Sequence, residues 1–151
     1  MNNLIASLVE LLDPSTVLTG ADISEKYHAD WSGADPCQPL ALLKPKTTQQ
    51  LSEIMALCHQ HDQPVVIQGG LTGLAGGATP QSGEIAISLE RMNGIEELDA
   101  TAMTVTALAG TPLQVLQDAA EDRELFLPLD LGARGSCNIG GNVATNAGGT
   151  E

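Results

Sequence analysis

The chain has 151 residues, of which 42% are hydrophobic and 17% charged, which fits one globular domain rather than a disordered segment. Nineteen acidic residues against six basic ones give a formal net charge of −13, so the long-range field disfavours nucleic acid and anionic membrane surfaces as partners. With one Trp, one Tyr and one Phe, the chain also lacks the aromatic platform that single-stranded nucleic acid requires.

Cysteine usage and the N-terminal stretch bear on the compartment. Cys37, Cys58 and Cys137 are odd in number and lack CxxC spacing, which indicates neither a disulfide framework nor a metal site. Residues 2–12 have no basic flank and include Glu10, so they are typical of an amphipathic helix rather than a signal peptide. No apolar run is long enough to span a bilayer. We expect a cytoplasmic protein with no membrane span.

The first predicted element is a helix over residues 4–12, where apolar residues recur at helical spacing until Asp13-Pro14 ends the run. Residues 16–39 are poor in periodicity and rich in Gly, Asp, Ser and Pro. They predict an irregular lead-in with one helical turn near residues 23–28. Trp31 is expected to anchor this segment.

Residues 40–77 predict the order strand, helix, strand, loop. A short apolar run at 40–43 is followed by Thr47 or Thr48, either of which can cap a helix. The apolar face of that helix is expected to carry Leu51, Ile54, Met55 and Cys58. The β-branched run 65–67 then leads into a glycine-rich stretch, so two parallel strands joined by a right-handed crossover are expected. The loop would leave the carboxyl end of the second strand.

Three further strands are predicted at residues 85–89, 95–98 and 104–108, with Asn93-Gly94 as a turn. A helix is predicted to follow, with Thr111 as its cap and Pro112 at its first position. Its apolar face would carry Leu113, Leu116, Ala119 and Ala120. A short helix is expected near residues 138–145.

The glycine loop, residues 69–77, contains five glycines in nine positions directly after a predicted strand. Successive N–H groups in such a loop can converge on phosphate oxygens. The loop lacks the Gly-Lys-Ser/Thr ending of a nucleotide-kinase loop, and it is not a standard dinucleotide fingerprint that opens a helix. A tightly turned loop without a ligand is the alternative interpretation.

The C-terminal run, residues 127–149, contains six glycines and many small polar groups. It can supply N–H donors and side-chain amides with little bulk, so the two runs together predict a groove for an anion. Arg134 could contact a phosphate or substrate carboxylate, or form a surface ion pair. Cys137 is interpreted as a packing residue rather than a redox thiol. His59 and His61, at the end of the predicted helix, indicate favourable interaction with the helix dipole rather than a metal site.

Both runs resemble the FAD-binding domain of the vanillyl-alcohol oxidase and p-cresol methylhydroxylase type, and the likeness extends from about residue 40 to the end. Residues 64–77 resemble the pyrophosphate loop of that family, while residues 89–93 and 109–113 resemble its next landmarks. Residues 128–149 are similar to the segment that lines the flavin. They are especially like the branch with D-2-hydroxyglutarate and D-lactate dehydrogenases and the glycolate oxidase FAD subunit.

The resemblance implies a set of FAD-contacting positions. Those at the pyrophosphate would be Gly69, Gly70, Leu71, Thr72, Gly73, Leu74 and Gly77. Those along the ribityl chain and ring would be Pro128, Leu129, Gly132, Ser136, Cys137, Gly140, Gly141, Asn142, Thr145 and Ala147. Leu71 stands where the family usually has Gly or Asn. Members with covalent flavin carry a histidine in the first loop, so its absence here implies non-covalent FAD.

The implied fold is α+β, a two-subdomain FAD-binding domain in which a small parallel βαβ unit precedes a mixed or antiparallel sheet. Residues 1–39 would form the lead-in and residues 40–151 the FAD-binding domain, truncated on its C-terminal side. We expect exposed strand edges with a risk of self-association, and weak FAD binding.

The implied activity is oxidation of a small 2-hydroxy acid by FAD, with an electron acceptor, in a longer protein. No catalytic residue is identified in this chain, which alone is expected to be inactive. Three alternatives stay open. They are a UDP-N-acetylenolpyruvoylglucosamine reductase-like flavoenzyme, a non-catalytic FAD or nucleotide carrier, and a ligand-free structural domain.

Overall fold

The structure is a computed structural model that describes residues 2–149. Its helices and strands are α1 (Asn2–Leu11), β1 (Val17–Leu18), β2 (Leu42–Leu43), α2 (Thr48–Gln60), β3 (Val65–Gln68), β4 (Ile85–Ser88), β5 (Ile95–Asp99), β6 (Thr104–Ala107), α3 (Leu113–Glu121) and α4 (Ile139–Ala144). Short 3-10 turns occupy Pro14–Thr16, Gly20–Asp22 and Glu25–Tyr27. The helices at 4–12 and 138–145, the strands and the turn near residues 23–28 are therefore confirmed, with small differences in their bounds.

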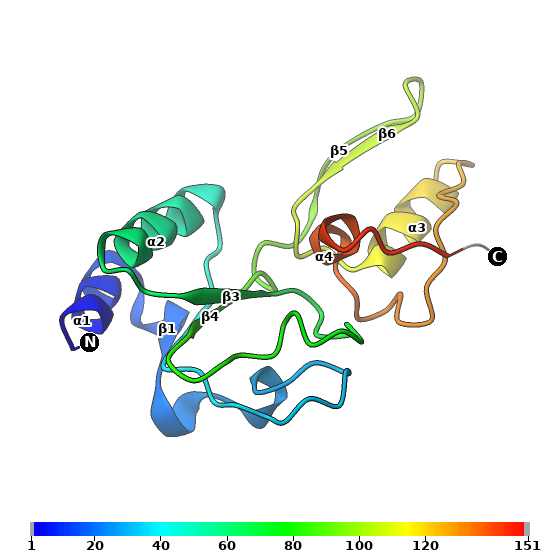
Figure 1. Cartoon of the computed structure of the whole chain (residues 1–151). Helices are drawn as coiled ribbons and strands as arrows, with labels where there is room; N and C mark the ends of the chain where they lie inside the picture. Colours follow the sequence, from blue (N-terminus) through cyan, green and yellow to red (C-terminus); the bar gives the residue numbers. More distant parts are fainter. Residues whose placement is uncertain (1, 150–151) are drawn as a thin grey trace.

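The elements form two lobes (Figure 1). The first lobe contains α1, α2 and a four-stranded sheet in the order β1-β2-β4-β3, and the second contains the β5–β6 hairpin with α3 and α4. Strands β2, β4 and β3 are parallel, and β1 pairs antiparallel with β2. The predicted α+β arrangement is confirmed. The strands that α2 connects are parallel, as predicted, and β4 lies between them.

The core of the first lobe joins α1 and α2 to the sheet. Leu4 and Leu8 on α1 pack in one buried cluster with Ile54 and Cys58 on α2 and with apolar residues of β2 and β4. Burial in this cluster raises the pKa of the Cys58 thiol. Residues of the lead-in thus belong to the same core as the sheet, while the division of the chain at residue 39 stays a prediction.

The predicted cap of α2 is confirmed, whereas the predictions for Met55 and Trp31 were wrong. Thr47 caps the helix, and its hydroxyl accepts from the Gln50 N–H at 3.1 Å. Met55, however, is 41% exposed and Trp31 is 63% exposed, so neither belongs to the core. The lead-in is instead anchored by Tyr27, which is 3% exposed within a second cluster of the first lobe.

The second lobe corrects one prediction, about a helix cap. Residues 93 and 94 lie between β4 and β5, which belong to different sheets, so the predicted turn connects the lobes. Thr111 is not a helix cap, because α3 begins at Leu113 with Pro112 as its N-cap. The Thr111 side chain is fully buried, donates to the Leu108 carbonyl at 2.7 Å and accepts from the Gly94 N–H at 2.9 Å. It therefore holds the bend together from inside.

Candidate functional site

The glycine loop leaves the carboxyl end of β3, as predicted. Within the described residues 2–149, none of the N–H groups from Gly69 to Gly77 donates a hydrogen bond to the protein. Backbone donors in folded proteins are normally paired, with protein, water or ligand. The loop therefore presents a continuous series of main-chain donors to its surroundings, which is the chemistry of an anion-binding nest.

Buried polar side chains close the base of this loop. Gln68, fully buried at the end of β3, donates through Nε2 to the carbonyls of Tyr27 at 2.9 Å and Ala78 at 3.0 Å. Asp30 accepts from the Ala78 N–H at 3.2 Å and the Thr79 hydroxyl at 3.1 Å. Gln68 directly precedes the loop and Ala78 directly follows it, so these contacts hold both ends of the loop. They use none of the N–H groups of residues 69–77.

The charge state of Asp30 supports this role. Burial by itself would raise the pKa of the Asp30 carboxyl, but hydrogen bonds from Ser32, Ala78 and Thr79 outweigh burial and lower the pKa below its ordinary value. The group is therefore an ionised acceptor at neutral pH, and charge strengthens its bonds to the loop.

The glycine loop and the C-terminal run lie against each other. A Cβ built on Gly70 would stand 2.0 Å from the Ser136 carbonyl oxygen, and one on Gly69 would stand 3.4 Å from Asn138 Oδ1. Only glycine allows backbone to approach backbone this closely at position 70. The predicted meeting of the two runs is present in the structure.

Several N–H groups of the C-terminal run donate hydrogen bonds to the second lobe. The N–H groups of Ile139 and Gly140 donate to the carbonyls of Thr111 and Ala109 at 2.9 and 2.8 Å. The Asn142 side chain donates to Cys137 Sγ at 3.4 Å, with both residues buried. Cys137 is thus a packing residue as interpreted, and Asn142 points to it instead of to a groove.

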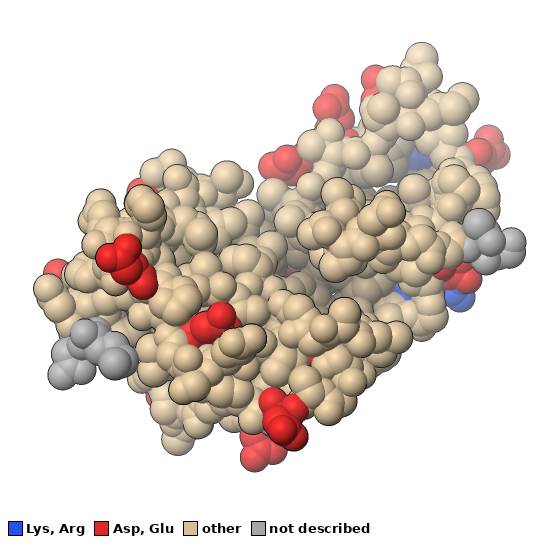
Figure 2. Space-filling model, in the orientation of Figure 1, with Lys and Arg blue, Asp and Glu red and all other residues tan. Residues whose placement is uncertain are grey.

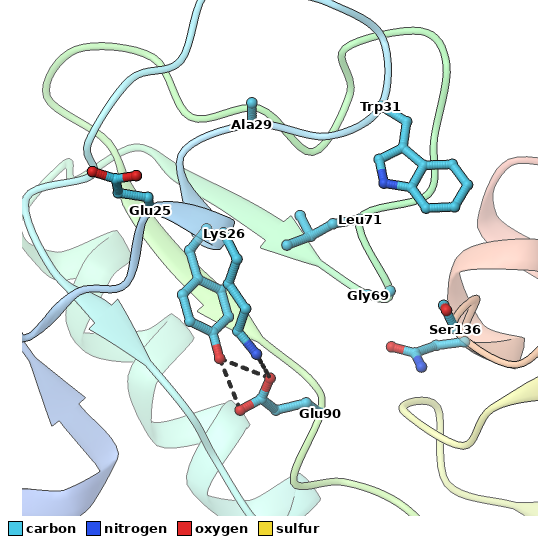
Figure 3. Close-up of a pocket in the computed structure, with 11 residues that line it drawn as sticks. Glu25, Lys26, Ala29, Trp31, Gly69, Leu71, Glu90 and Ser136 are labelled. Atoms are coloured by element: carbon cyan, nitrogen blue, oxygen red, sulfur yellow. Dashed lines mark hydrogen bonds and ion pairs between the residues drawn. The ribbon is translucent and has the colours of Figure 1, made fainter. Parts of the chain in front are cut away.

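A cavity of about 490 Å³ lies beside the contact between the two runs. Its lining combines the lead-in, the start of the glycine loop, the residues after β4 and the C-terminal run (Figure 3). The lining residues are Glu25, Lys26, Tyr27, Ala29, Trp31, Gly69, Gly70, Leu71, Glu90, Ser136 and Asn138. Asn138 is 7% exposed, and its Oδ1 has no hydrogen-bond partner in the described chain. The cavity wall therefore contains a buried acceptor without a partner, close to loop donors that are unbonded within residues 2–149.

At the cavity wall, the Glu90 carboxylate is paired with nearby lysine ammonium groups. Lys44 Nζ lies 2.8 Å from Glu90 Oε1 and donates to the Tyr27 hydroxyl at 2.7 Å, while that hydroxyl donates to Glu90 at 2.8 Å. Lys26 Nζ lies 3.5 Å from Glu90. Burial alone would raise the pKa of Glu90, but Lys44, Tyr27 and Lys26 lower it below its ordinary value. On the face shown in Figure 2, acidic side chains are scattered over both lobes and do not gather in one patch.

Of the predicted cofactor positions, the structure brings Gly69, Gly70, Leu71 and Ser136 to the cavity wall. The other predicted positions do not line it. Leu74 is 77% exposed at the surface, and Pro128, Gly132 and Thr145 are exposed as well. The contact of each position with FAD stays a prediction.

Sequence reasoning missed Lys26, Tyr27, Trp31, Glu90 and Asn138 as cavity residues. Glu90 stood inside a landmark of the family resemblance, and Tyr27 was the chain's single tyrosine, so both carried a weak signal. Asn138 lies inside the C-terminal run that resembles the flavin-lining segment, whereas Lys26 and Trp31 are brought to the cavity by tertiary contacts alone.

Arg134 forms an ion pair with Asp130 at 3.0 Å between the guanidinium Nη1 and the carboxylate Oδ1. Of the two roles considered for this side chain, the surface ion pair is present in the structure.

The comparisons with known proteins agree with this geometry. A family model described as "FAD binding domain" matches residues 39–151, which is most of the chain. The chain belongs to this family. Within residues 2–149 of this FAD-binding domain, no helix combines the length and apolar character needed to cross a bilayer.

Curated relatives of the domain are much longer than this chain. It is 41% identical over 143 residues to a protein of Danio rerio named D-2-hydroxyglutarate dehydrogenase, mitochondrial, covering 95% of this chain and 27% of the relative. It is 42% identical over 143 residues to a Schizosaccharomyces pombe protein provisionally named a mitochondrial D-lactate dehydrogenase, with the same coverage. The chain thus spans about a quarter of the length of these relatives.

Solved structures show the same fold. The domain superposes on p-cresol methylhydroxylase with a TM-score of 0.80 at 20% sequence identity, covering 94% of this chain and 28% of that one. The family assignment, the fold and the relation to D-2-hydroxyglutarate and D-lactate dehydrogenases are confirmed.

Proposed function

We propose that this chain is the FAD-holding portion of a dehydrogenase that oxidises a small 2-hydroxy acid, of the D-2-hydroxyglutarate or D-lactate class, and passes the electrons to an acceptor. The single observation that carries the proposal is the glycine loop, whose N–H groups from Gly69 to Gly77 have no acceptor in the described chain. The names of the relatives supply the substrate class.

The residues present fit a bound dinucleotide on the strength of that loop, whose main-chain donors suit the diphosphate oxygens. The unpartnered Asn138 oxygen beside it is an acceptor, so it suits a hydroxyl or N–H donor of the cofactor rather than the diphosphate. In the proposal, the main-chain N–H groups of the glycine loop hold the diphosphate, and Asp30 and Gln68 keep the loop in shape from behind. Backbone donors suit an acidic chain, because they bind an anion without requiring Lys or Arg. The C-terminal run forms the second wall, along the ribityl chain and ring.

Bound FAD would supply hydride acceptance, and the protein would supply binding and orientation. Non-covalent attachment is part of the proposal. It is supported by the absence of histidine from residues 69–77 and by the burial of Cys137, whose sulfur already accepts from Asn142. Denaturing a loaded, purified protein is expected to release all of its FAD into solution. Flavin that stays with the precipitated chain would contradict this part.

The main test is a titration of the chain with FAD, monitored by flavin fluorescence. We expect weak quenching, with a dissociation constant above the micromolar range. ADP should compete, because it carries the diphosphate, whereas riboflavin, which lacks the diphosphate, should bind more weakly than FAD. Equal binding of riboflavin would place recognition on the ring and contradict the role of the loop. No quenching at any concentration would contradict FAD binding by this chain.

The substrate class needs a longer protein that contains this chain. Such a protein, loaded with FAD, should reduce an artificial dye when given D-2-hydroxyglutarate or D-lactate. Flavin reduction by NADPH without any hydroxy acid would favour the reductase alternative instead.

We also propose a cytoplasmic location and self-association of the chain. A cytoplasmic location rests on composition, whereas several relatives carry mitochondrial names. Self-association is supported by the β5–β6 hairpin, which pairs with no other strand among the described residues, and by β3 at a sheet edge with Ile67 44% exposed. Light scattering after size-exclusion chromatography should give a mass above 15.6 kDa. A monomer mass at high concentration would contradict this.

A further inference from the structure

Leu71 occupies an unfavourable backbone conformation at the start of the glycine loop. Its φ is +59°, in the left-handed region where Cβ of an ordinary residue crowds the following carbonyl. The preceding residue, Gly70, is fixed against the Ser136 backbone, so the chain must bend away from the C-terminal run at this point. A leucine in this bend requires compensation from its surroundings.

The side chain of Leu71 provides that compensation. It packs against the buried cluster of Ile23, Tyr27, Leu42, Val66 and Ala86, and it points from the loop into the cavity (Figure 3). The loop has few other attachments between its ends, since none of its N–H groups is bonded within the described chain. Gln68 and Asp30 act only at its base. The Leu71 side chain is therefore an apolar attachment inside the loop itself.

We propose that Leu71 is a positioning residue, which holds the glycine loop in its anion-binding shape before any ligand arrives. Glycine or asparagine in this position would relieve the backbone strain, but would leave the bend without an apolar anchor. With leucine at this position, the loop carries backbone strain but is already ordered before the ligand binds. A preordered site binds more tightly, because less conformational entropy is lost on binding. The effect on ligand binding rests on the proposed function, whereas the effect on the loop does not.

The first measurement concerns the ligand-free chain. Backbone ¹⁵N relaxation should give order parameters of about 0.85 for residues 69–77 in the wild type, and these order parameters should fall to about 0.6 in Leu71→Gly. Leu71→Met, which keeps an apolar side chain of similar size, should retain the ordered loop. A wild-type loop that is already mobile, or a Leu71→Gly loop as ordered as the wild type, would overturn the proposal.

Met103 offers a matched control for backbone strain. It also has a positive φ, of 55°, but its side chain is 76% exposed at the hairpin. Met103→Gly should relieve strain without losing packing, so its thermal midpoint should rise and the glycine loop should not change. Leu71→Gly should lower the midpoint, since lost packing outweighs the relief. A rise of the midpoint in both variants would show that the Leu71 side chain anchors nothing.

FAD titration then separates the two proposals. If the mutant loop must be ordered on binding, FAD binding by Leu71→Gly should weaken by at least roughly tenfold, the cost of fixing one backbone residue, with recovery in Leu71→Met. Equal affinity in the wild type and Leu71→Gly would overturn the role of Leu71 while leaving FAD binding intact. If the wild type itself fails to bind FAD, the proposed function fails, and the relaxation data alone decide whether Leu71 orders the loop.

Discussion

Replacing Gly70 with alanine is expected to push the glycine loop away from the C-terminal run. The added Cβ would lie 2.0 Å from the Ser136 carbonyl oxygen and 2.9 Å from Cys137 Cα. Ordinary van der Waals contact begins near 3.4 Å, so the two segments must separate by more than an ångström. All of the crowded atoms belong to the backbone, and a side-chain rotation therefore cannot relieve the clash.

Gly70→Ala should lower both the free energy of unfolding, through overpacking, and the affinity for FAD, through displacement of the loop. Forcing extra bulk into a packed contact costs about 1–3 kcal/mol of unfolding free energy, and urea unfolding of the chain measures this directly. The displacement also moves loop N–H groups relative to the second wall. A loss of about 1.4 kcal/mol in binding corresponds to tenfold weaker FAD affinity, which the fluorescence titration measures.

Gly135→Ala is the matched control, because Gly135 neighbours Ser136 and a Cβ there meets no atom within 4 Å. Gly→Ala at a compatible site stabilises by about 0.4–1 kcal/mol through the unfolded chain, so this variant should be as stable as the wild type or slightly more so. A Gly70→Ala chain with wild-type stability and FAD affinity would refute the contact between the two runs.

Further predictions concern the polar groups behind the site. Glu90→Gln should lower the free energy of unfolding by about 1–2 kcal/mol in urea, because it leaves the largely buried Lys44 ammonium poorly paired. Since Glu90 is 37% exposed, we expect a value at the low end of this range. Because the pKa values of Glu90 and Asp30 are lowered on folding, their stabilisation is present in full above their ordinary values of 4.5 and 3.8. It should be lost as the pH falls through the lowered values; an acid titration of the unfolding midpoint checks this, and a midpoint that rises on acidification would contradict it. Thr111→Val should cost about 1–3 kcal/mol, because the Gly94 N–H loses its buried acceptor, whereas Thr111→Ser should restore most of it; equal stability of the two variants would show that the hydroxyl is dispensable.

The local elements could be predicted because their signals are short-range. Thr47 caps α2 through a contact three residues away, and Asp13-Pro14 ends α1 by excluding helical backbone. Where a distant partner competes for the same group, the local signal was wrong. Thr111 has the residue type of a cap, but its hydroxyl is recruited by Gly94, seventeen residues earlier in the chain.

The candidate site was predictable in part for the same reason. Runs of small residues are visible in a sequence, and their likeness to an FAD-binding family identified both walls. The residues that complete the cavity carried at most a weak signal, since Tyr27 and Glu90 meet only after the lead-in folds across the sheet. Trp31 shows the opposite error, because a large aromatic residue was expected inside and lies exposed at the cavity.

The sequence by itself determined the family, the order of helices and strands, and the two glycine-rich runs, because each of these is written in neighbouring residues. Only the tertiary structure decided that β4 lies between β2 and β3, that Gly70 touches Ser136, and that the N–H donors of the loop are unbonded within residues 2–149. Those facts depend on which distant groups compete for a given contact. Burial, shape and hydrogen-bond demand settle that competition across the whole fold, and no local pattern encodes it.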